Sequence, residues 1–169
     1  MTKAYELELW QNLYVMLGGA SAALTGLLFV AVSLHIRAIV GDPTLRARAW
    51  ANICLIVTLV INATVILVPQ DVTAVGIGVC VVTMSFLGFF IWRIIRFRSA
   101  GLVLPWRVIV VILLNLMGIA AGLSLISRWG GGMYAVTVYF CATLAWVIFN
   151  AWAILLVASE EETDRRGIN

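Results

Sequence analysis

The fold of this chain is decided by an apolar stretch at residues 13–36, which reads LYVMLGGASAALTGLLFVAVSLHI. The stretch contains no Asp, Glu, Lys or Arg. An α-helix needs about 20 predominantly apolar residues to cross a hydrocarbon core of about 30 Å. We therefore expect this stretch to span a membrane.

Four further stretches have the same character and are separated by short polar breaks. Strands of a membrane barrel alternate apolar and polar residues, whereas these stretches are apolar on all sides, which favours helices. The sequence predicts an all-α, polytopic transmembrane helical bundle that forms one domain over residues 1–169. The expected spanning helices are 13–36, 49–68, 73–92, 106–126 and 133–157, followed by a short cytoplasmic tail at 158–169.

The composition supports a membrane protein, because 63% of the residues are hydrophobic and only 11% are charged. Soluble domains have roughly 45–50% and about 25%. The net charge of +3 does not indicate nucleic acid, since the arginines fall between apolar stretches and not along one helix face.

The breaks between the stretches contain turn and capping residues. Asp42 before Pro43 is typical of a capped helix start, and Pro69–Asp71 predicts a tight hairpin between the second and third helices. Ser99–Gly101 separates the third and fourth helices, and Gly130–Gly132 predicts a flexible turn before the fifth.

The distribution of basic residues predicts the orientation, because Lys and Arg in short loops are retained in the cytoplasm. With five helices and the amino terminus outside, only Lys3 and Arg128 remain external. The carboxyl terminus is then cytoplasmic, together with Arg37, Arg46, Arg48, Arg93, Arg96, Arg98, Arg107, Arg165 and Arg166.

No residue pattern indicates catalysis. The middle of each predicted helix lacks Asp, Glu, Lys and Arg, and His35 is the single histidine. The cysteines, Cys54, Cys80 and Cys141, lack the spacing of a zinc site. We expect no enzyme activity, no cofactor and no metal site.

Uncharged polar residues in the second and fourth helices are the candidate pore-lining positions. These are Thr58, Asn62 and Asn115. A carboxamide facing lipid would lack hydrogen-bond partners, so each side chain should face protein or water. Hydrogen bonding between helices and the lining of a pore are both open interpretations.

Small residues predict close helix packing. Gly18, Ala22 and Gly26 recur at every fourth position, and Gly118 and Gly122 share a face of the fourth helix. The spacing leaves open whether these faces meet another helix of the same chain or a second copy.

Arginines near the cytoplasmic helix ends should favour anionic lipid headgroups, by about 1 kcal/mol for each charge near the surface. The candidate headgroup contacts are Arg46, Arg48, Arg93, Arg96 and Arg98.

The opening of the chain, Trp10 followed by GGASAALTGLLFV at residues 18–30, resembles small multi-pass bacterial inner-membrane proteins of unassigned function. The resemblance covers the first helix and implies a bacterial inner membrane.

A bundle of 18.5 kDa offers few helices to enclose a wide path, whereas several copies around an axis could do so. The sequence therefore suggests a homo-oligomeric channel or transport pore for a small solute or ion. The alternative is a non-catalytic structural or regulatory subunit that binds another membrane protein.

Overall fold

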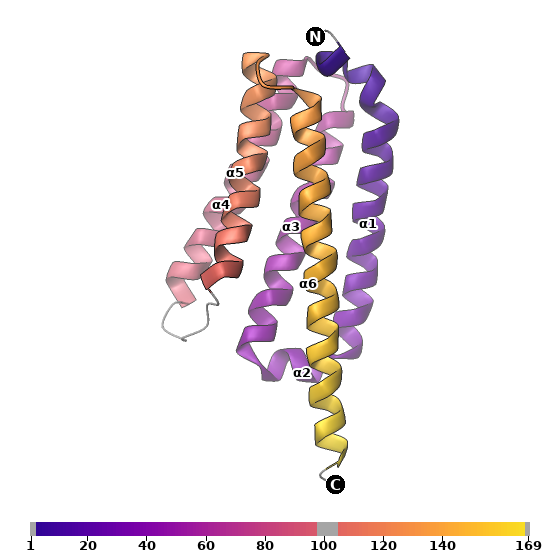
Figure 1. The fold of residues 1–169 in the computed structure, drawn as a ribbon, viewed down its shortest axis with the longest axis vertical. Helices are drawn as coiled ribbons and strands as arrows, with labels where there is room; N and C mark the ends of the chain where they lie inside the picture. The colour runs from indigo at the N-terminus through magenta and orange to yellow at the C-terminus, as the bar shows by residue number, and fades with distance from the viewer. Residues whose placement is uncertain (1–2, 98–104, 168–169) are drawn as a thin grey trace.

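The computed structural model describes residues 3–97 and 105–167, and every regular element in these ranges is a helix (Figure 1). Two short 3-10 turns, η1 (Lys3–Tyr5) and η2 (Leu7–Trp10), precede the helices. The helices are α1 (Gln11–Leu34), α2 (Ile36–Gly41), α3 (Pro43–Leu67), α4 (Val72–Phe97), α5 (Pro105–Ser127) and α6 (Met133–Gly167).

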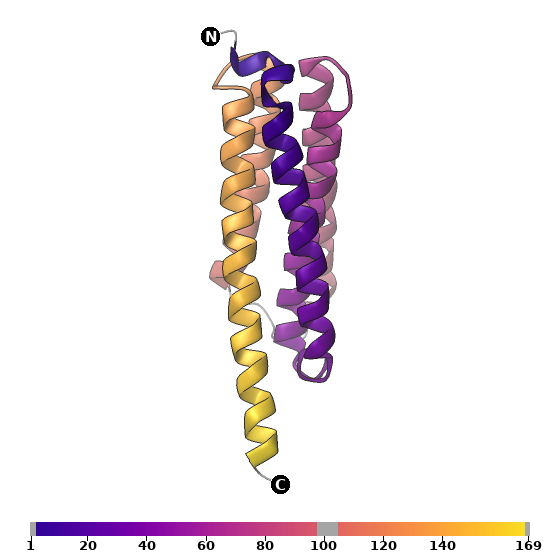
Figure 2. The same cartoon turned by 90° about the vertical axis from the view of Figure 1, so that its right-hand side faces the viewer.

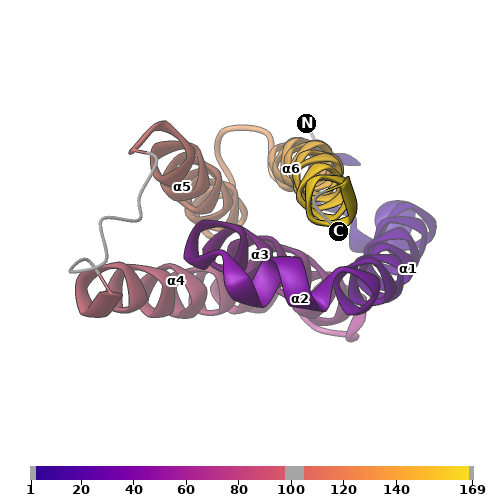
Figure 3. The same cartoon turned by 90° about the horizontal axis from the view of Figure 1, so that it is seen from below.

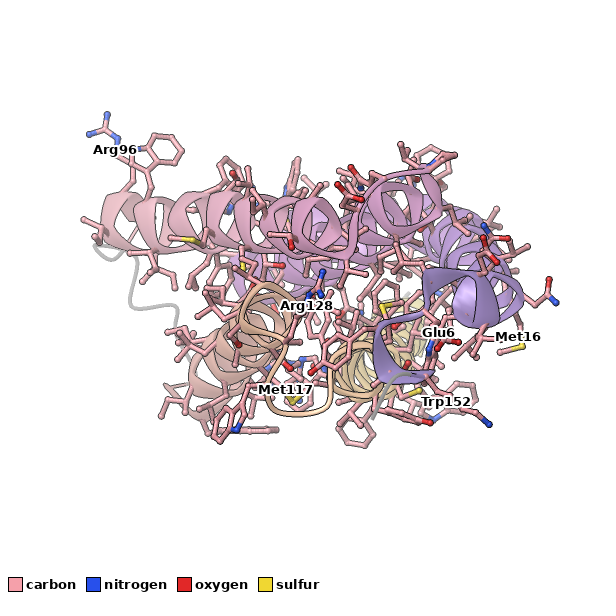
Figure 4. The ribbon with its side chains drawn as sticks, turned by 90° about the horizontal axis from the view of Figure 1, so that it is seen from above. Glu6, Met16, Arg96, Met117, Arg128 and Trp152 are labelled. Atoms are coloured by element: carbon pink, nitrogen blue, oxygen red, sulfur yellow. The ribbon has the colours of Figure 1, made fainter. Side chains whose placement is uncertain are left out.

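Within the described ranges, α1, α3, α4, α5 and α6 are long and apolar enough to cross a membrane. The prediction of an all-α bundle with five spanning helices is confirmed. Large apolar side chains cover the outside of the bundle, and Figure 4 shows Met16 and Trp152 pointing away from it. Such a surface is stable in lipid, so the chain is an integral membrane protein.

The spanning helices form two rows, which are seen end-on in Figure 3. One row contains α1, α3 and α4, and the other contains α5 and α6. Helix α3 is central because it packs against α1, α4 and α6, while α4 and α5 pack along each other. The chain ends lie at opposite ends of the bundle, and the last turns of α6 project beyond the other helices (Figure 2).

The second spanning helix begins at Pro43, six positions before the predicted start at residue 49. Asp42 is the N-cap, and its Oδ1 accepts a hydrogen bond from the Thr44 backbone N–H at 2.7 Å. Apolarity identifies only the segment that lies in hydrocarbon, whereas the capping residues mark where the helix begins. Arg46 and Arg48 consequently lie on the first turns of α3 and not in a loop.

Helices also extend beyond the other predicted bounds. Helix α4 runs to Phe97, past the predicted end at residue 92, and α6 continues through most of the predicted tail, to Gly167. The short helix α2 was not predicted. Glu and Arg are good helix formers, so a helix continues after its apolar segment has ended. The predicted break at Ser99–Gly101 lies outside the described residues.

The predicted turn at Gly130–Gly132 has an ordered geometry. All three glycines have positive φ, a backbone conformation that glycine adopts without steric cost. The Ser124 hydroxyl donates to the Trp129 carbonyl at 2.6 Å and accepts from the Gly132 N–H at 2.9 Å. This turn makes α5 and α6 antiparallel neighbours.

Candidate functional site: a polar band and an arginine cavity

Polar side chains from three helices meet inside the bundle. Asn62 of α3 donates from Nδ2 to the Thr83 Oγ1 of α4 at 3.4 Å. The Tyr139 side chain of α6 lies beside both. Each of the three residues is at most 1% exposed, so the contact links three helices across the interior.

Gly118 of α5 makes room for this contact. A Cβ at position 118 would lie 2.9 Å from Tyr139 Cε2 and Cζ and 3.0 Å from Thr83 Cγ2. These distances are shorter than normal van der Waals contact. The absence of a side chain at Gly118 therefore lets α5 approach α4 and α6.

A second polar layer lies one helical turn nearer to the end of the bundle where α3 begins. Its members are Thr58, Asn115 and Thr143, which lie three or four positions from Asn62, Gly118 and Tyr139 along their helices. All are buried. We refer to both layers together, namely Thr58, Asn62, Thr83, Asn115, Tyr139 and Thr143, as the polar band.

The second layer is incompletely hydrogen bonded. Thr58 Oγ1 donates to the Cys54 carbonyl at 2.7 Å, and Asn115 Nδ2 donates to the Val111 carbonyl at 2.8 Å, both within their own helices. Among the described residues, Asn115 Oδ1 and Thr143 Oγ1 have no hydrogen-bond partner. Unpaired buried polar atoms cost about 1–3 kcal/mol each, and Asn62 Oδ1 of the first layer is likewise without a partner among the described residues.

The three candidate pore-lining residues are buried in the interior of the bundle that one chain forms. They are Thr58, Asn62 and Asn115. The sequence did not identify Thr83, Tyr139 and Thr143 as their neighbours. Tyr139 and Thr143 are four positions apart in the fifth apolar stretch, as Thr58 and Asn62 are in the second, and residues at this spacing share one helix face.

An apolar layer separates the polar band from a cavity lined by arginines. Leu55, Val111 and Val147 belong to one buried cluster, one turn beyond Thr58, Asn115 and Thr143. This cluster lies between the band and the end of the bundle where α3 begins.

Beyond the apolar layer is a cavity of about 670 Å³ between α3, α4, α5 and α6, which we call the arginine cavity. Its basic lining comes from Arg46, Arg48, Arg93 and Arg107. No carboxylate belongs to the lining formed by the described residues. The remaining walls are formed by Asn52 and Asn150 and by apolar side chains that include Leu55, Phe90, Val111 and Trp146.

Arg107 makes contacts with α6 and with its own helix. Its Nη1 donates to Asn150 Oδ1 of α6 at 2.8 Å, and its guanidinium lies 5.0 Å from the ring centroid of Trp106. The positive charge of Arg48 acts on it. The Nε atoms of Arg48 and Arg107 are buried and have no hydrogen-bond partner in the described part of the chain.

Two more contacts hold the cavity wall in place. Asn52 Nδ2 donates to the Val147 carbonyl at 3.1 Å, which connects α3 to α6. Arg93 lies over the Trp50 ring at 5.1 Å, which connects α4 to α3. The basic groups are therefore supported by neighbouring helices.

The candidate lipid-headgroup arginines separate into two groups. Arg46, Arg48 and Arg93 line the cavity, whereas Arg96 projects away from the bundle (Figure 4). Arg98 lies outside the described residues. The sequence missed Asn52 and Asn150 as cavity residues, although a lone Asn in an apolar stretch signals a position that faces protein or water.

The candidate helix-packing residues fall into those that face another helix and those that do not. A Cβ at Gly18 would lie 3.0 Å from Ala63 of α3, whereas Ala22 is exposed and Gly26 has open space beside it. Gly118 and Gly122 both face the interior, and a Cβ at Gly122 would meet Cys80 of α4 at 2.5 Å.

Within residues 3–97 and 105–167, no three His, Cys, Asp or Glu side chains converge in a way that could hold a metal ion. The arrangement is that of a helical integral membrane protein with a basic cavity at one end and a polar band in its interior. Comparison with protein-family models, with curated proteins and with solved structures gives no match for the chain.

Proposed function

We propose that the chain is a membrane transport protein that passes a small solute or ion through its own bundle and assembles as a homo-oligomer. The observation that carries the proposal is the polar band, whose buried Asn115 and Thr143 side chains keep unused hydrogen-bonding capacity. The polar band is buried within one chain. This burial supports a solute path through each copy of the protein, and not a path along an axis shared between copies.

The path would run from the arginine cavity across the apolar layer to the polar band. Leu55, Val111 and Val147 form a constriction of the kind that gates by excluding water. Uncharged Asn and Thr side chains can replace part of a solute's hydration without imposing a full charge. Small displacements of α5 against α3 and α6 would open the constriction.

Asn115→Leu tests this path more cleanly than a change at Asn62, because the Asn115 side chain hydrogen bonds only within its own helix. Full-length protein in liposomes should conduct one member of a panel of small ions and neutral solutes. Loss of a polar group from a dehydrated path costs about 1–3 kcal/mol, so flux should fall by roughly 5- to 150-fold. The melting temperature in detergent should stay close to that of wild type.

Thr143→Val and Thr64→Val form a matched pair. Thr143 lies in the band, whereas Thr64 is exposed on α3 and bonds to the Val60 carbonyl. Only Thr143→Val should reduce flux. If wild-type protein gives no flux above empty liposomes and Asn115→Leu lowers the melting temperature, the band is structural and the transport proposal is wrong.

The second candidate is a non-catalytic subunit that binds another membrane protein. It is favoured by α1, where Gly19, Ala22, Ala23 and Gly26 are exposed and no described helix covers them. Ala23→Leu should then abolish co-purification of one stoichiometric membrane protein, and it should leave the flux of a transport protein unchanged.

A further inference from the structure

We propose that the arginine cavity is a binding site for the phosphate group of an anionic amphiphile, such as a membrane phospholipid or its lyso form. This site is independent of the transport proposed above, because it requires binding only. It is also more specific than the attraction of surface arginines to anionic lipid, since it depends on one cavity and includes Arg107.

The charge of the cavity favours an anion. Four guanidinium groups line one space, and Arg48 and Arg107 lie close enough for the charge of one to act on the other. The described lining contains no carboxylate beside Arg48 and Arg107. Repulsion between like charges is strong near the low-dielectric interior, so a bound anion would stabilise the arrangement.

The donors favour phosphate. Guanidinium groups present planar, forked N–H donors that match phosphate oxygens, often with two hydrogen bonds from one arginine. The buried Nε atoms of Arg48 and Arg107 have no partner among the described residues. Arg107 reaches the cavity from α5 and is oriented by Asn150 of α6, so its donors are held in place before a ligand arrives.

The size and walls favour an amphiphile over a free phosphate ion. A cavity of about 670 Å³ lies within the range of about 300–1,000 Å³ that holds drug-sized ligands. An inorganic phosphate would fill only a small part of it. Leu55, Phe90, Val111 and Trp146 provide an apolar wall for a glycerol backbone and the first methylene groups.

The cavity lies between two pairs of helices. Towards the arginine end, α4 and α5 lean away from α3 and α6, and the cavity takes its lining from both pairs (Figure 1). A headgroup could therefore occupy the cavity while its acyl chains remain in the bilayer.

The test uses full-length protein in detergent with dioctanoyl phosphatidic acid, dioctanoylglycerol, dioctanoyl phosphatidylcholine and inorganic phosphate as probes. Native mass spectrometry and melting curves measure binding. Phosphatidic acid should bind best, inorganic phosphate at least about tenfold more weakly and dioctanoylglycerol not detectably. Equal binding of inorganic phosphate would show a free-anion site and overturn the amphiphile assignment, as would equal binding of dioctanoylglycerol.

Arg107→Gln and Arg96→Gln are the matched charge variants. Both remove one positive charge from the same end of the bundle, but only Arg107 lines the cavity, and Arg96 points away from it (Figure 4). Arg107→Gln should weaken phosphatidic acid binding by about tenfold, whereas Arg96→Gln should leave it nearly unchanged. Equal losses in the two variants would mean that lipid binds only through surface charge.

Ala51→Phe provides a test that keeps every charge and does not depend on the folding of an arginine variant. Ala51 lines the cavity, so a phenyl ring there would occupy ligand space. The matched variant is Ala23→Phe on the exposed face of α1. Loss of phosphatidic acid binding in Ala51→Phe alone supports the cavity site, and unchanged binding in both variants overturns it.

Discussion

Gly118 of α5 lies directly against the ring of Tyr139 of α6, so closely that a Cβ on Gly118 would come within 2.9 Å of two ring atoms. Both residues are buried, and the same Cβ would lie 3.0 Å from Thr83 Cγ2 of α4. The polar band and the packing of α5 consequently depend on the same glycine.

Gly118→Ala should therefore destabilise the protein by about 1–3 kcal/mol, the usual cost of overpacking a dense core. The measurement is the melting temperature of purified protein in detergent. Gly88→Ala is the matched control, because a Cβ at that position of α4 has open space around it. Equal melting temperatures for the two variants would contradict the close contact.

Gly18→Ile should lower thermal stability because Gly18 faces Ala63 of α3 at close range. Gly26→Ile should leave the stability of the bundle unchanged, because the space beside Gly26 is open. If the outer face of α1 joins two copies, Gly26→Ile should instead change the oligomeric state seen in light scattering. A large loss of stability in Gly26→Ile would mean that the two glycines do not differ as the structure indicates.

Asp42→Ala should reduce stability by about 1 kcal/mol, because Asp42 Oδ1 caps the first turn of α3 at the Thr44 N–H. Asp42→Asn keeps an acceptor oxygen and should retain most of the stability. Melting curves of the two variants compare them directly. A loss of the same size in both would show that the charge of Asp42 matters and not the cap.

Topology can be tested with single cysteines in a chain whose Cys54, Cys80 and Cys141 have been replaced by alanine. Gln70→Cys and Gly131→Cys should react with an impermeant thiol reagent added outside intact cells, and Gly41→Cys should react only after lysis. The distribution of arginines also predicts one fixed orientation. Labelling of all three positions from outside would show that the chain inserts in both orientations.

The spanning helices could be predicted from the sequence because their cause is local. Transfer of about 20 apolar residues into hydrocarbon is favourable whatever their neighbours are, and the backbone must then satisfy its hydrogen bonds as a helix. The start of α3 could be predicted from Asp42 and Pro43 for the same reason, although apolarity alone placed it too late. Apolarity likewise gave no sign of α2 or of the continuation of α6 to Gly167.

The sequence also identified Asn62 and Asn115 as positions that should face protein or water, since a lone polar group in lipid is costly, and Gly118 as a position of close helix packing. It could not identify their partners. Whether Asn62 meets Thr83, and whether Gly118 meets Tyr139, depends on how each helix is rotated about its axis and on which helices are neighbours.

Only the tertiary structure brings Arg48, Arg93 and Arg107 to one cavity and leaves Arg96 outside it. The four residues have similar local sequence environments near helix ends, so composition and charge treat them alike. Their difference comes from the packing of α3, α4, α5 and α6, in which close contacts at small residues fix the rotation of each helix. The sequence by itself determined that the chain crosses a membrane. The packing of its helices decided which charges face one another, because the direction in which an arginine side chain points depends on how several helices are placed and rotated relative to one another.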